Sequence, residues 1–310
     1  SMNSNNNTIP FRAVSRLQPG RTLVFAPHPD DEIFGCGGAI LRHVQQGDEV
    51  KVVIVTDGGY AAHPHQQHPA YVSQRWAESV GVSKMLGYPE PIFLNYRDRS
   101  LVAGETLIRH FFQILLEFAP QYVFLPAASE IHPDHQAVHS SGIQAIERYH
   151  EIVQVFLYEV GIPLQPNLLL DITDIQPLLE KAMQQFISQQ EVQDYSRHIS
   201  ALHAYRTYTL PGNIQYAEAY DVFTSKKLST GDAWWEKIPK TDAGSATKSP
   251  KHEVPLVSVI VRTMNRPELS DALNSIARQD FPEVEVIVVS GSGQALKLGP
   301  SCGPFPIHQV

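Results

Sequence analysis

The sequence has little cysteine, no long apolar run and no excess of basic residues. Only two of its 310 residues are cysteines, Cys36 and Cys302, too few for the disulfide framework of a small secreted protein. We therefore expect a reducing compartment, the cytoplasm. No apolar run approaches the roughly 18 residues of a membrane span. With 24 Lys and Arg against 32 Asp and Glu, the net charge of -8 argues against general binding to nucleic acid or to a membrane surface.

The first residues lack the apolar core of a signal sequence. Ser1 and Met2 resemble the remnant of a cleaved tag, and the asparagine-rich residues after them favour a flexible N-terminus over 1–19. Apolar residues make up 43% of the chain and charged residues 18%, which is an ordinary globular composition. The length predicts one large domain or two unequal ones.

Apolar runs alternate with segments of helical periodicity between residues 20 and 225. The runs that indicate buried strands are 21–26, 50–56, 91–95, 121–126 and 153–158. The helical segments between them are about 33–46, 71–87, 104–118 and 133–148. A strand in "NLLLDITD", helices at about 174–190 and 194–206, and a late strand in "IQYAEAYDVF" follow. Continuous apolar strands separated by helices predict a mainly parallel sheet covered on both faces, so we expect a Rossmann-like three-layer α/β/α sandwich.

The last third of the chain departs from this pattern. Residues 226–254 are rich in Lys, Ser, Thr, Gly and Pro, which is typical of a linker. Residues 255–310 then show strand–helix–strand patterning and predict a small, incomplete β-α-β unit. Two parallel strands and one helix bury too little surface to fold alone. We therefore expect this unit to dock on the first domain or to begin a longer one.

Polar, metal-competent side chains follow the ends of the predicted strands. "HPDDE" (28–32) comes directly after the first strand, and "SEIHPDH" (129–135) comes after the fourth. Asp57 follows the second strand and Asp98 the third. Because ligands of open α/β sheets bind beyond the carboxyl ends of the strands, we expect all of these side chains at one edge of the sheet.

The residue types in the two acidic, histidine-containing segments suit a catalytic metal. Zinc binds imidazole and carboxylate groups, and a catalytic zinc needs three protein ligands and an open position. The neighbouring Asp30 and Asp31 cannot both point comfortably at one ion, so one is expected to bind metal and the other to act as a base. Pro133 suits the first turn of a helix, which puts His132 at its cap and His135 about one turn inside. Only one of these two histidines need bind the ion.

Purely structural interpretations of the same residues stay open. His28 alone fits a strand-end residue bonded to backbone, and the acidic residues at 30–32 fit a helix dipole. The glycines at 35, 37 and 38 lack the spacing of a dinucleotide-binding loop. The joint occurrence of two clusters at two strand ends favours the metal site. We expect a solvated loop rather than a second metal cluster for His63, His65 and His68.

The paired segments "APHPDDE" and "HPDH" resemble the zinc-dependent LmbE/PIG-L family of N-deacetylases. The resemblance covers roughly residues 20–225 and includes "VIVTDGG", "RWAESVGVSKMLG" and "YAEAYDVF". It implies a Rossmann-like fold and removal of an N-acetyl group from an N-acetylglucosamine-type sugar or glycoconjugate. The implied partner is a small molecule or glycan that bears an acylated amino sugar.

By motif position, the resemblance also implies roles for individual residues. The ligands of zinc, or of another divalent transition metal such as Fe²⁺, are His28, Asp31 and His135. Asp30 is the general base, and His132, supported by Asp134, stabilises the oxyanion or protonates the amine. Substrate contacts are implied for Arg75, Asp57 and Asp98.

The segment "VSVIVRTMNRPELSDALNSIARQDF" resembles the opening of family 2 glycosyltransferases. Those enzymes place an acidic residue after the second strand, where this chain has Ser290, Gly291 and Ser292, and no D-x-D follows. We therefore expect a truncated transferase-like segment and no glycosyl transfer. Two alternative functions remain: a zinc amidase acting on a larger N-acyl or thiol-conjugate substrate, or a non-catalytic carbohydrate-binding module attached to a glycosyltransferase. The sequence leaves the oligomeric state open, a homo-oligomer included.

Overall fold

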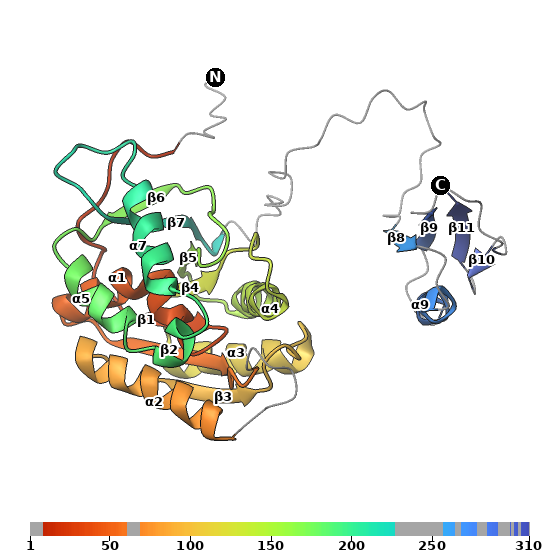
Figure 1. Ribbon diagram of the computed structural model, residues 1–310, viewed down its shortest axis with the longest axis horizontal. Coiled ribbons are helices and arrows are strands. Elements are labelled where there is room, and N and C mark those ends of the chain that lie inside the picture. The colour runs from red at the N-terminus through yellow and green to blue at the C-terminus, as the bar shows by residue number, and fades with distance from the viewer. Residues whose placement is uncertain are drawn as a thin grey trace. The chain divides into compact units, whose positions relative to one another are not determined.

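The computed structural model in Figure 1 describes residues 9–60, 69–226, 257–263, 268–277, 284–290, 298, 301–302 and 305–309. The chain divides into two compact units, Ser1–Glu236 and Lys237–Val310. The boundary between them falls within the predicted linker, of which residues 227–254 lie outside the described residues. The histidine-rich loop with His63, His65 and His68 lies outside them as well.

The first unit is built around a seven-stranded sheet with the order β3-β2-β1-β4-β5-β7-β6. Its strands are β1 (Thr22–Ala26), β2 (Val50–Thr56), β3 (Ile92–Tyr96), β4 (Tyr122–Pro126), β5 (Gln154–Tyr158), β6 (Leu168–Asp171) and β7 (Ala217–Thr224). Neighbouring strands from β3 to β5 are parallel, whereas β7 runs antiparallel to both β5 and β6. The prediction of a mainly parallel sheet is confirmed.

The helices of this unit lie between the strands in the chain, as the periodicity predicted. They are α1 (Asp31–Gln46), α2 (Pro69–Leu86), α3 (Glu105–Phe118), α4 (Pro133–Arg148), α5 (Gln176–Met183), α6 (Ile187–Gln190) and α7 (Tyr195–Tyr205). The helix predicted over 174–190 is divided, because Phe186 leaves the helical conformation and is fully buried. No helix among the described residues is both long and apolar enough to cross a membrane.

Helices cover both faces of the sheet, which gives the expected three layers (Figure 1). Along β1, Val24 and Ala26 belong to a core shared with α1, α2, α5 and α7, while Leu23 and Phe25 belong to a core shared with α3 and α4. A strand buried on both faces is apolar at every position, which is why the sequence shows continuous runs rather than alternation. Each large side chain buried in this way contributes about 1.5–3 kcal/mol.

Helix α1 lies close to the sheet and is interrupted at Cys36 (φ -151°, ψ 27°). Beyond the interruption, the buried carboxylate of Glu218 on β7 accepts hydrogen bonds from the backbone N–H groups of Gly38 (2.6 Å) and Ala39 (2.9 Å). A Cβ atom on Gly38 would lie 2.7 Å from Glu218 Cδ, so only glycine permits this approach. An acidic side chain from the sheet therefore satisfies backbone donors that the interrupted helix leaves open.

Part of the segment expected to be flexible, 1–19, is attached to the first unit. The backbone N–H of Val14 donates to the carbonyl of Leu169 (2.9 Å), and the N–H of Asp171 donates to the carbonyl of Val14 (2.8 Å). Leu17 is buried in the core. These backbone bonds pair Val14 in parallel with the edge strand β6. The polar composition of the segment did not indicate this pairing.

The described residues of the second unit form a four-stranded sheet with the order β10-β11-β9-β8. Its elements are β8 (Val257–Thr263), α9 (Glu268–Ile276), β9 (Val284–Ser290), β10 (Ser301–Cys302) and β11 (Phe305–Gln309). Strands β8 and β9 are parallel, as the predicted β-α-β unit requires. The sequence did not predict β11, which pairs in parallel with β9, or β10, which pairs antiparallel with β11.

Candidate metal centre and active site

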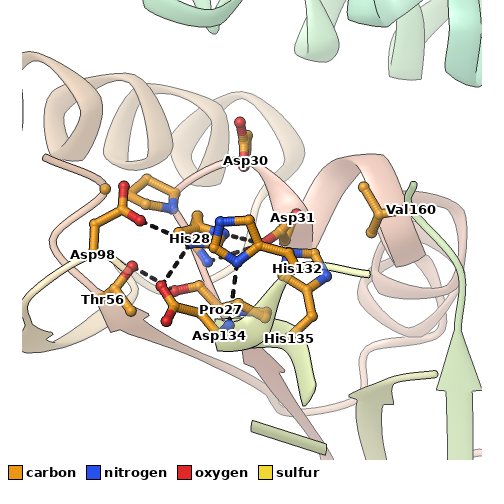
Figure 2. A network of polar contacts seen from close by, with 12 residues as sticks. Pro27, His28, Asp30, Asp31, Thr56, Asp98, His132, Asp134, His135 and Val160 are labelled. Atoms are coloured by element: carbon orange, nitrogen blue, oxygen red, sulfur yellow. Dashed lines mark hydrogen bonds and ion pairs between the residues drawn. The ribbon is translucent and has the colours of Figure 1, made fainter. Parts of the chain in front are cut away.

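The candidate site lies at the carboxyl ends of β1 and β4, where the strand order reverses. Strand β1 is paired with β2 on one side and with β4 on the other, and the crevice at such a switch point is the usual ligand position in open α/β sheets. The chain leaves β1 through Pro27 and His28 and enters α1 at Asp31. It leaves β4 and enters α4 at Pro133 with His132 as the cap. The two motifs that are far apart in the sequence therefore meet here (Figure 2).

The three residues predicted as metal ligands converge on one carboxylate oxygen. Asp31 Oδ2 lies 3.1 Å from His28 Nδ1 and 3.1 Å from His135 Nε2. Ligands held about 2.0–2.2 Å from one tetrahedral ion stand a little over about 3 Å apart, so the separation of each histidine from Asp31 suits a shared cation. Burial alone would raise the pKa of Asp31, but the rings of His135 and His28 hold that pKa well below its usual range. Two imidazoles and one carboxylate are a fitting donor set for a divalent transition metal.

The outer nitrogens of both candidate histidine ligands face carboxylates. His28 Nε2 lies 3.2 Å from Asp134 Oδ2 and 3.3 Å from Asp98 Oδ1, and His135 Nδ1 lies 3.7 Å from Glu130 Oε2. A histidine that binds a metal normally donates its second ring N–H to a carboxylate, so the arrangement at His28 also fits a metal centre, whereas His135 Nδ1 faces Glu130 without a hydrogen bond. Burial would lower the pKa of His28, but hydrogen bonds with Asp134, Asp31 and Asp98 hold it well above its ordinary value.

Asp30, predicted as the general base, stands beside the ligands and is held by Arg75 of α2. Arg75 Nη2 donates to Asp30 Oδ2 (2.9 Å) and to the carbonyl of Pro29 (2.6 Å), while its Nη1 donates to the carbonyl of Gly58 (3.0 Å). Asp30 has φ 137°, a strained value for a residue other than glycine. Burial raises the pKa of Asp30 to about 7, although Arg75 acts in the opposite direction. A carboxylate with a pKa near neutrality suits proton transfer at physiological pH.

The backbone of Asp30 has a second support, which the sequence did not reveal. Its N–H donates to Glu32 Oε2 (2.8 Å), and Ser79 Oγ on α2 donates to Glu32 Oε1 (2.9 Å). The sequence placed Glu32 among the polar residues at this edge of the sheet, with the dipole of the next helix as an alternative, and gave it no individual role. Burial raises its pKa to about 8. One sequence pattern could have indicated this support: Ser79 and Arg75 are four residues apart and so share one face of α2.

His132 lies at the cap of α4, as predicted. Its Nδ1 accepts a hydrogen bond from the backbone N–H of Asp134 (3.2 Å), which leaves Nε2 as the protonated nitrogen. Burial, together with the charges of His28 and His135, lowers the pKa of His132 and favours the neutral ring. The ring lies edge-on to His28, with 4.6 Å between the centroids (Figure 2).

The hydrogen bonds of the Asp134 carboxylate go to groups other than His132, and its charge opposes the lowering of the His132 pKa. The predicted support of His132 by Asp134 stays a prediction. Asp134 Oδ2 faces His28 and accepts the backbone N–H of Arg99 (2.7 Å), and its Oδ1 accepts the N–H of Leu101 (3.2 Å). The loop after β3 offers these two amides to a fully buried carboxylate, and a buried carboxylate is stable only where such donors meet it.

The three residues predicted to contact substrate each have partners inside the protein. Arg75 is 4% exposed and bonded to Asp30. Asp98 bridges His28 and the backbone N–H of Tyr60 (3.1 Å). Asp57 Oδ1 accepts the N–H groups of Gly59 (2.9 Å) and Asp98 (3.0 Å). All three lie at the expected edge of the sheet, and their contact with substrate stays a prediction.

Residues 23–146 match the sequence model of the PIG-L family, described as GlcNAc-PI de-N-acetylase. The matched segment contains both motifs and every candidate residue named above. It ends well before residue 255, so the resemblance of 255–310 to family 2 glycosyltransferases gains no support from it.

The chain is also similar to individual deacetylases. It is 28% identical over 163 residues to a 1D-myo-inositol 2-acetamido-2-deoxy-alpha-D-glucopyranoside deacetylase of Kineococcus radiotolerans, and the match covers 42% of this chain and 45% of that protein. It is 25% identical over 206 residues to the diacetylchitobiose deacetylase of Thermococcus kodakarensis, covering 58% and 72%. The chain thus spans less than half of the first relative's length.

A solved structure gives the same likeness in three dimensions. The N,N'-diacetylchitobiose deacetylase of Pyrococcus horikoshii, complexed with its inhibitor MPG, superposes with a TM-score of 0.58 at 25% sequence identity. The superposition covers 67% of this chain and 85% of that one. The expected LmbE-like α/β fold is therefore confirmed.

Proposed function

Since residues 23–146 match the PIG-L family and the similar proteins are named deacetylases, we propose that this chain is a metal-dependent N-deacetylase. Its substrate is an N-acetylglucosamine-type sugar or glycoconjugate. The observation that carries the proposal is the meeting of His28 and His135 at one oxygen of Asp31, with the carboxylate of Asp30 beside them. We also propose a cytoplasmic location, on the low cysteine content.

The residues that would hold the ion are His28, Asp31 and His135. Their donor types favour zinc, with Fe²⁺ as the alternative. When bound, the ion supplies Lewis-acid chemistry: it polarises the acetyl carbonyl and lowers the pKa of water from about 15.7 to about 7.

Asp30 accepts the proton of the attacking water. Its pKa of about 7 leaves a large fraction in the basic form near neutral pH, and Arg75 keeps one of its oxygens fixed at 2.9 Å. Because both the side chain and the backbone of Asp30 are held, little reorganisation accompanies proton transfer. Asp30 then passes this proton to the amide nitrogen, so that a neutral amine leaves and the base is restored.

His132 serves as a hydrogen-bond donor to the reacting amide. Its Nδ1 is occupied by the backbone N–H of Asp134, so its Nε2–H is available to the carbonyl oxygen as negative charge develops there. A donor in this position is typically worth about 3–4 kcal/mol in the transition state. The carbon–nitrogen bond then breaks, and acetate and the free amino sugar are the products.

No activity is proposed for the second unit. Its described residues form a small sheet with one helix, and its resemblance to the opening of a family 2 glycosyltransferase stays a hypothesis. Arg75, Asp57 and Asp98 stay the proposed substrate contacts of the first unit, in addition to the internal partners that the structure gives them.

The proposal is tested with single substitutions in the full chain, using metal content and acetate release as separate readouts. Asp30→Asn is expected to keep the metal and lose about a hundredfold to ten-thousandfold in turnover, because only the base is removed. His28→Ala is expected to lose the metal itself. The matched controls are Asp174→Asn and His150→Ala, which change exposed residues and should match the wild type in both readouts.

A substrate panel separates the alternatives. N-acetylglucosamine, diacetylchitobiose and an N-acetylglucosaminyl inositol test the deacetylase directly, and longer N-acyl sugars and thiol-conjugate amides test a broader zinc amidase. Loading the protein with zinc or Fe²⁺ in turn identifies the more active ion. Metal uptake without hydrolysis of any compound in this panel would refute the enzyme and favour a binding module.

A further inference from the structure

The loops after β2 and β3 are joined to each other and to the candidate metal ligand His28. The backbone N–H of Asp98 donates to Asp57 Oδ1 (3.0 Å), and the N–H of Tyr60 donates to Asp98 Oδ2 (3.1 Å). The other oxygen of Asp98 lies 3.3 Å from His28 Nε2. A single carboxylate therefore fixes the position of Tyr60 relative to the metal centre.

Arg99 is tied to the same centre through its backbone. Its N–H donates to Asp134 Oδ2 at 2.7 Å, and Asp134 in turn faces His28. The side chain of Arg99 takes a different direction, because its guanidinium carbon lies 3.8 Å from the centroid of the Tyr60 ring. The guanidinium thus stacks on an aromatic ring beside the site, at a position fixed by the residues that orient His28.

The stacked guanidinium is exposed and forms no ion pair with any carboxylate of the described residues. Asp98 and Asp134 are already satisfied by backbone N–H groups and by His28, so Arg99 is not needed to neutralise them. Residues 61–68, which follow Tyr60 in the chain, contain no Asp or Glu. Neutralisation of a neighbouring carboxylate therefore does not explain why this chain, whose net charge is -8, places the cation of Arg99 here.

The backbone at Arg99 is also strained. Its φ of 60° is in the left-handed region, which costs a residue other than glycine about 1–2 kcal/mol. A strained backbone conformation persists only where surrounding contacts hold it in place, and such conformations are common at functional sites. Here the conformation lets the N–H reach Asp134 while the side chain lies over Tyr60. Stacking occupies a face of the guanidinium and leaves its N–H edge free to bind an oxyanion in the plane.

We propose that Arg99, held over the ring of Tyr60, binds an anionic group on the substrate. This rests on the proposed deacetylase function and narrows it: the preferred substrate is an acetylated amino sugar that carries a phosphate or a carboxylate. Both groups accept two parallel hydrogen bonds from a guanidinium edge, so the chemistry they share is that of an oxyanion. Arg99 acts as a specificity-determining residue and takes no part in bond breaking.

The test compares matched sugars that differ only in charge. N-acetylglucosamine 1-phosphate, N-acetylglucosamine 6-phosphate and a carboxylate-bearing N-acetylglucosaminide are each compared with the neutral methyl glycoside. The wild type is expected to favour at least one anionic sugar by about tenfold or more in kcat/KM, the size of one charge-assisted hydrogen bond. The anionic sugar with the highest kcat/KM shows whether Arg99 binds a phosphate or a carboxylate. The preference should weaken as salt is added.

Substitutions assign the preference to Arg99. Arg99→Gln is expected to lower the anionic-to-neutral ratio of kcat/KM about tenfold, and Arg99→Lys should lower it less, because lysine keeps the charge but loses the planar edge. The control Arg109→Gln removes an equally positive, exposed side chain from α3 and should leave the ratio unchanged. Metal content, measured for every variant, verifies that the site is still formed.

Equilibrium binding of the products separates this inference from the proposed function. Calorimetry with glucosamine, glucosamine 1-phosphate and glucosamine 6-phosphate reports the anion preference without turnover. Tighter binding of a phosphorylated product, lost in Arg99→Gln, supports the inference even if no substrate is hydrolysed, in which case only the deacetylase proposal fails. Equal treatment of neutral and anionic sugars by the wild type, or a ratio unchanged in Arg99→Gln, overturns the inference and leaves the deacetylase intact.

Discussion

Glu32 accepts a hydrogen bond from the backbone N–H of Asp30, at 2.8 Å, in a segment where Asp30 has φ 137°. The other oxygen of Glu32 accepts a hydrogen bond from Ser79, one helical turn from the Arg75 that binds the Asp30 carboxylate. Helix α2 therefore holds the proposed base at two points, directly at its side chain and through Glu32 at its backbone. The strained conformation of Asp30 depends on both.

Replacing Glu32 with Ala should loosen Asp30 without touching a metal ligand. The change leaves the N–H of Asp30 and the hydroxyl of Ser79 without their partner, which costs about 1–3 kcal/mol of the free energy of unfolding. A displaced base should also lower kcat about tenfold to a hundredfold. Acetate release and guanidinium unfolding measure the two effects.

Glu32→Gln is the matched control for this prediction. Its amide oxygen can accept from the N–H of Asp30 and its amide nitrogen can donate to Ser79 Oγ, so kcat should stay close to the wild type. Equal turnover of the Ala and Gln variants would show that the support of Asp30 by this side chain is unimportant.

Gly35→Ala should destabilise the first unit by overpacking. A Cβ atom at this position would lie 2.3 Å from Cδ2 of Tyr158, and that ring is anchored because its hydroxyl donates to the carbonyl of Phe25 (2.8 Å). Overpacking of this kind costs about 1–3 kcal/mol. Metal affinity should fall as well, since Phe25 lies three residues before His28.

The matched control is Gly81→Ala on α2, where an added Cβ would meet nothing within 4 Å. This substitution should be neutral or should stabilise the helix by up to about 1 kcal/mol. Guanidinium unfolding of both variants makes the comparison, and equal stability of the two would contradict a tight contact at Gly35.

Much of the fold could be predicted because its strands are buried on both faces. The run Leu23–Ala26 alternates between two cores, so every position is apolar and the strand is easily recognised. The same argument placed the two motifs together, because each follows a parallel strand and the carboxyl ends of such strands meet at one edge. The choice of His28, Asp31 and His135 within those motifs came from the resemblance to the LmbE/PIG-L family, and their binding of a metal stays a prediction.

Features that depend on contacts between distant elements could not be predicted. The direction of the Asp134 carboxylate depends on amides of the loop after β3, and no pattern near residue 134 records where those amides lie. The interruption of α1 at Cys36 likewise depends on Glu218, which is far along the chain on β7. Glu218 stands in an alternating strand pattern, and only its burial in the fold shows what it does.

The stability of the first unit should depend on pH through Glu218. Burial raises the pKa of Glu218 to about 7 from an ordinary value of 4.5, although Tyr220, the N–H groups of Gly38 and Ala39, and Arg42 act in the opposite direction. Between about pH 4.5 and about pH 7, Glu218 therefore keeps its proton in the folded protein and loses it in the unfolded chain. This contribution is fully present below about pH 4.5, is lost as pH rises through about 7, and amounts to about 3 kcal/mol.

Guanidinium unfolding between about pH 5 and about pH 8 tests this dependence. Glu218→Gln cannot titrate, so its free energy of unfolding should fall less over this range than that of the wild type, even though the amide fits the backbone donors of α1 less well. Glu191→Gln changes an exposed glutamate and should keep the dependence of the wild type. Parallel curves for the wild type and Glu218→Gln would contradict the raised pKa.

Asp134→Asn should weaken metal binding more than it slows the chemical step. The amide nitrogen cannot accept from His28 Nε2 or from the loop amides, so His28 loses one of the two carboxylates that orient it. Loss of such a partner typically lowers metal affinity about tenfold to a hundredfold. Competition with a chelator measures the affinity, and acetate release at saturating metal measures the chemistry.

Metal affinity and turnover at saturating metal together show whether Asp134 orients His28 or supports His132. If Asp134 served His132, the variant would bind metal as the wild type does and turn over slowly even when saturated. If it serves His28, as the 3.2 Å contact indicates, excess metal should restore most of the turnover. Asp174→Asn, an exposed aspartate on the first unit, should show neither effect and so controls for the substitution itself.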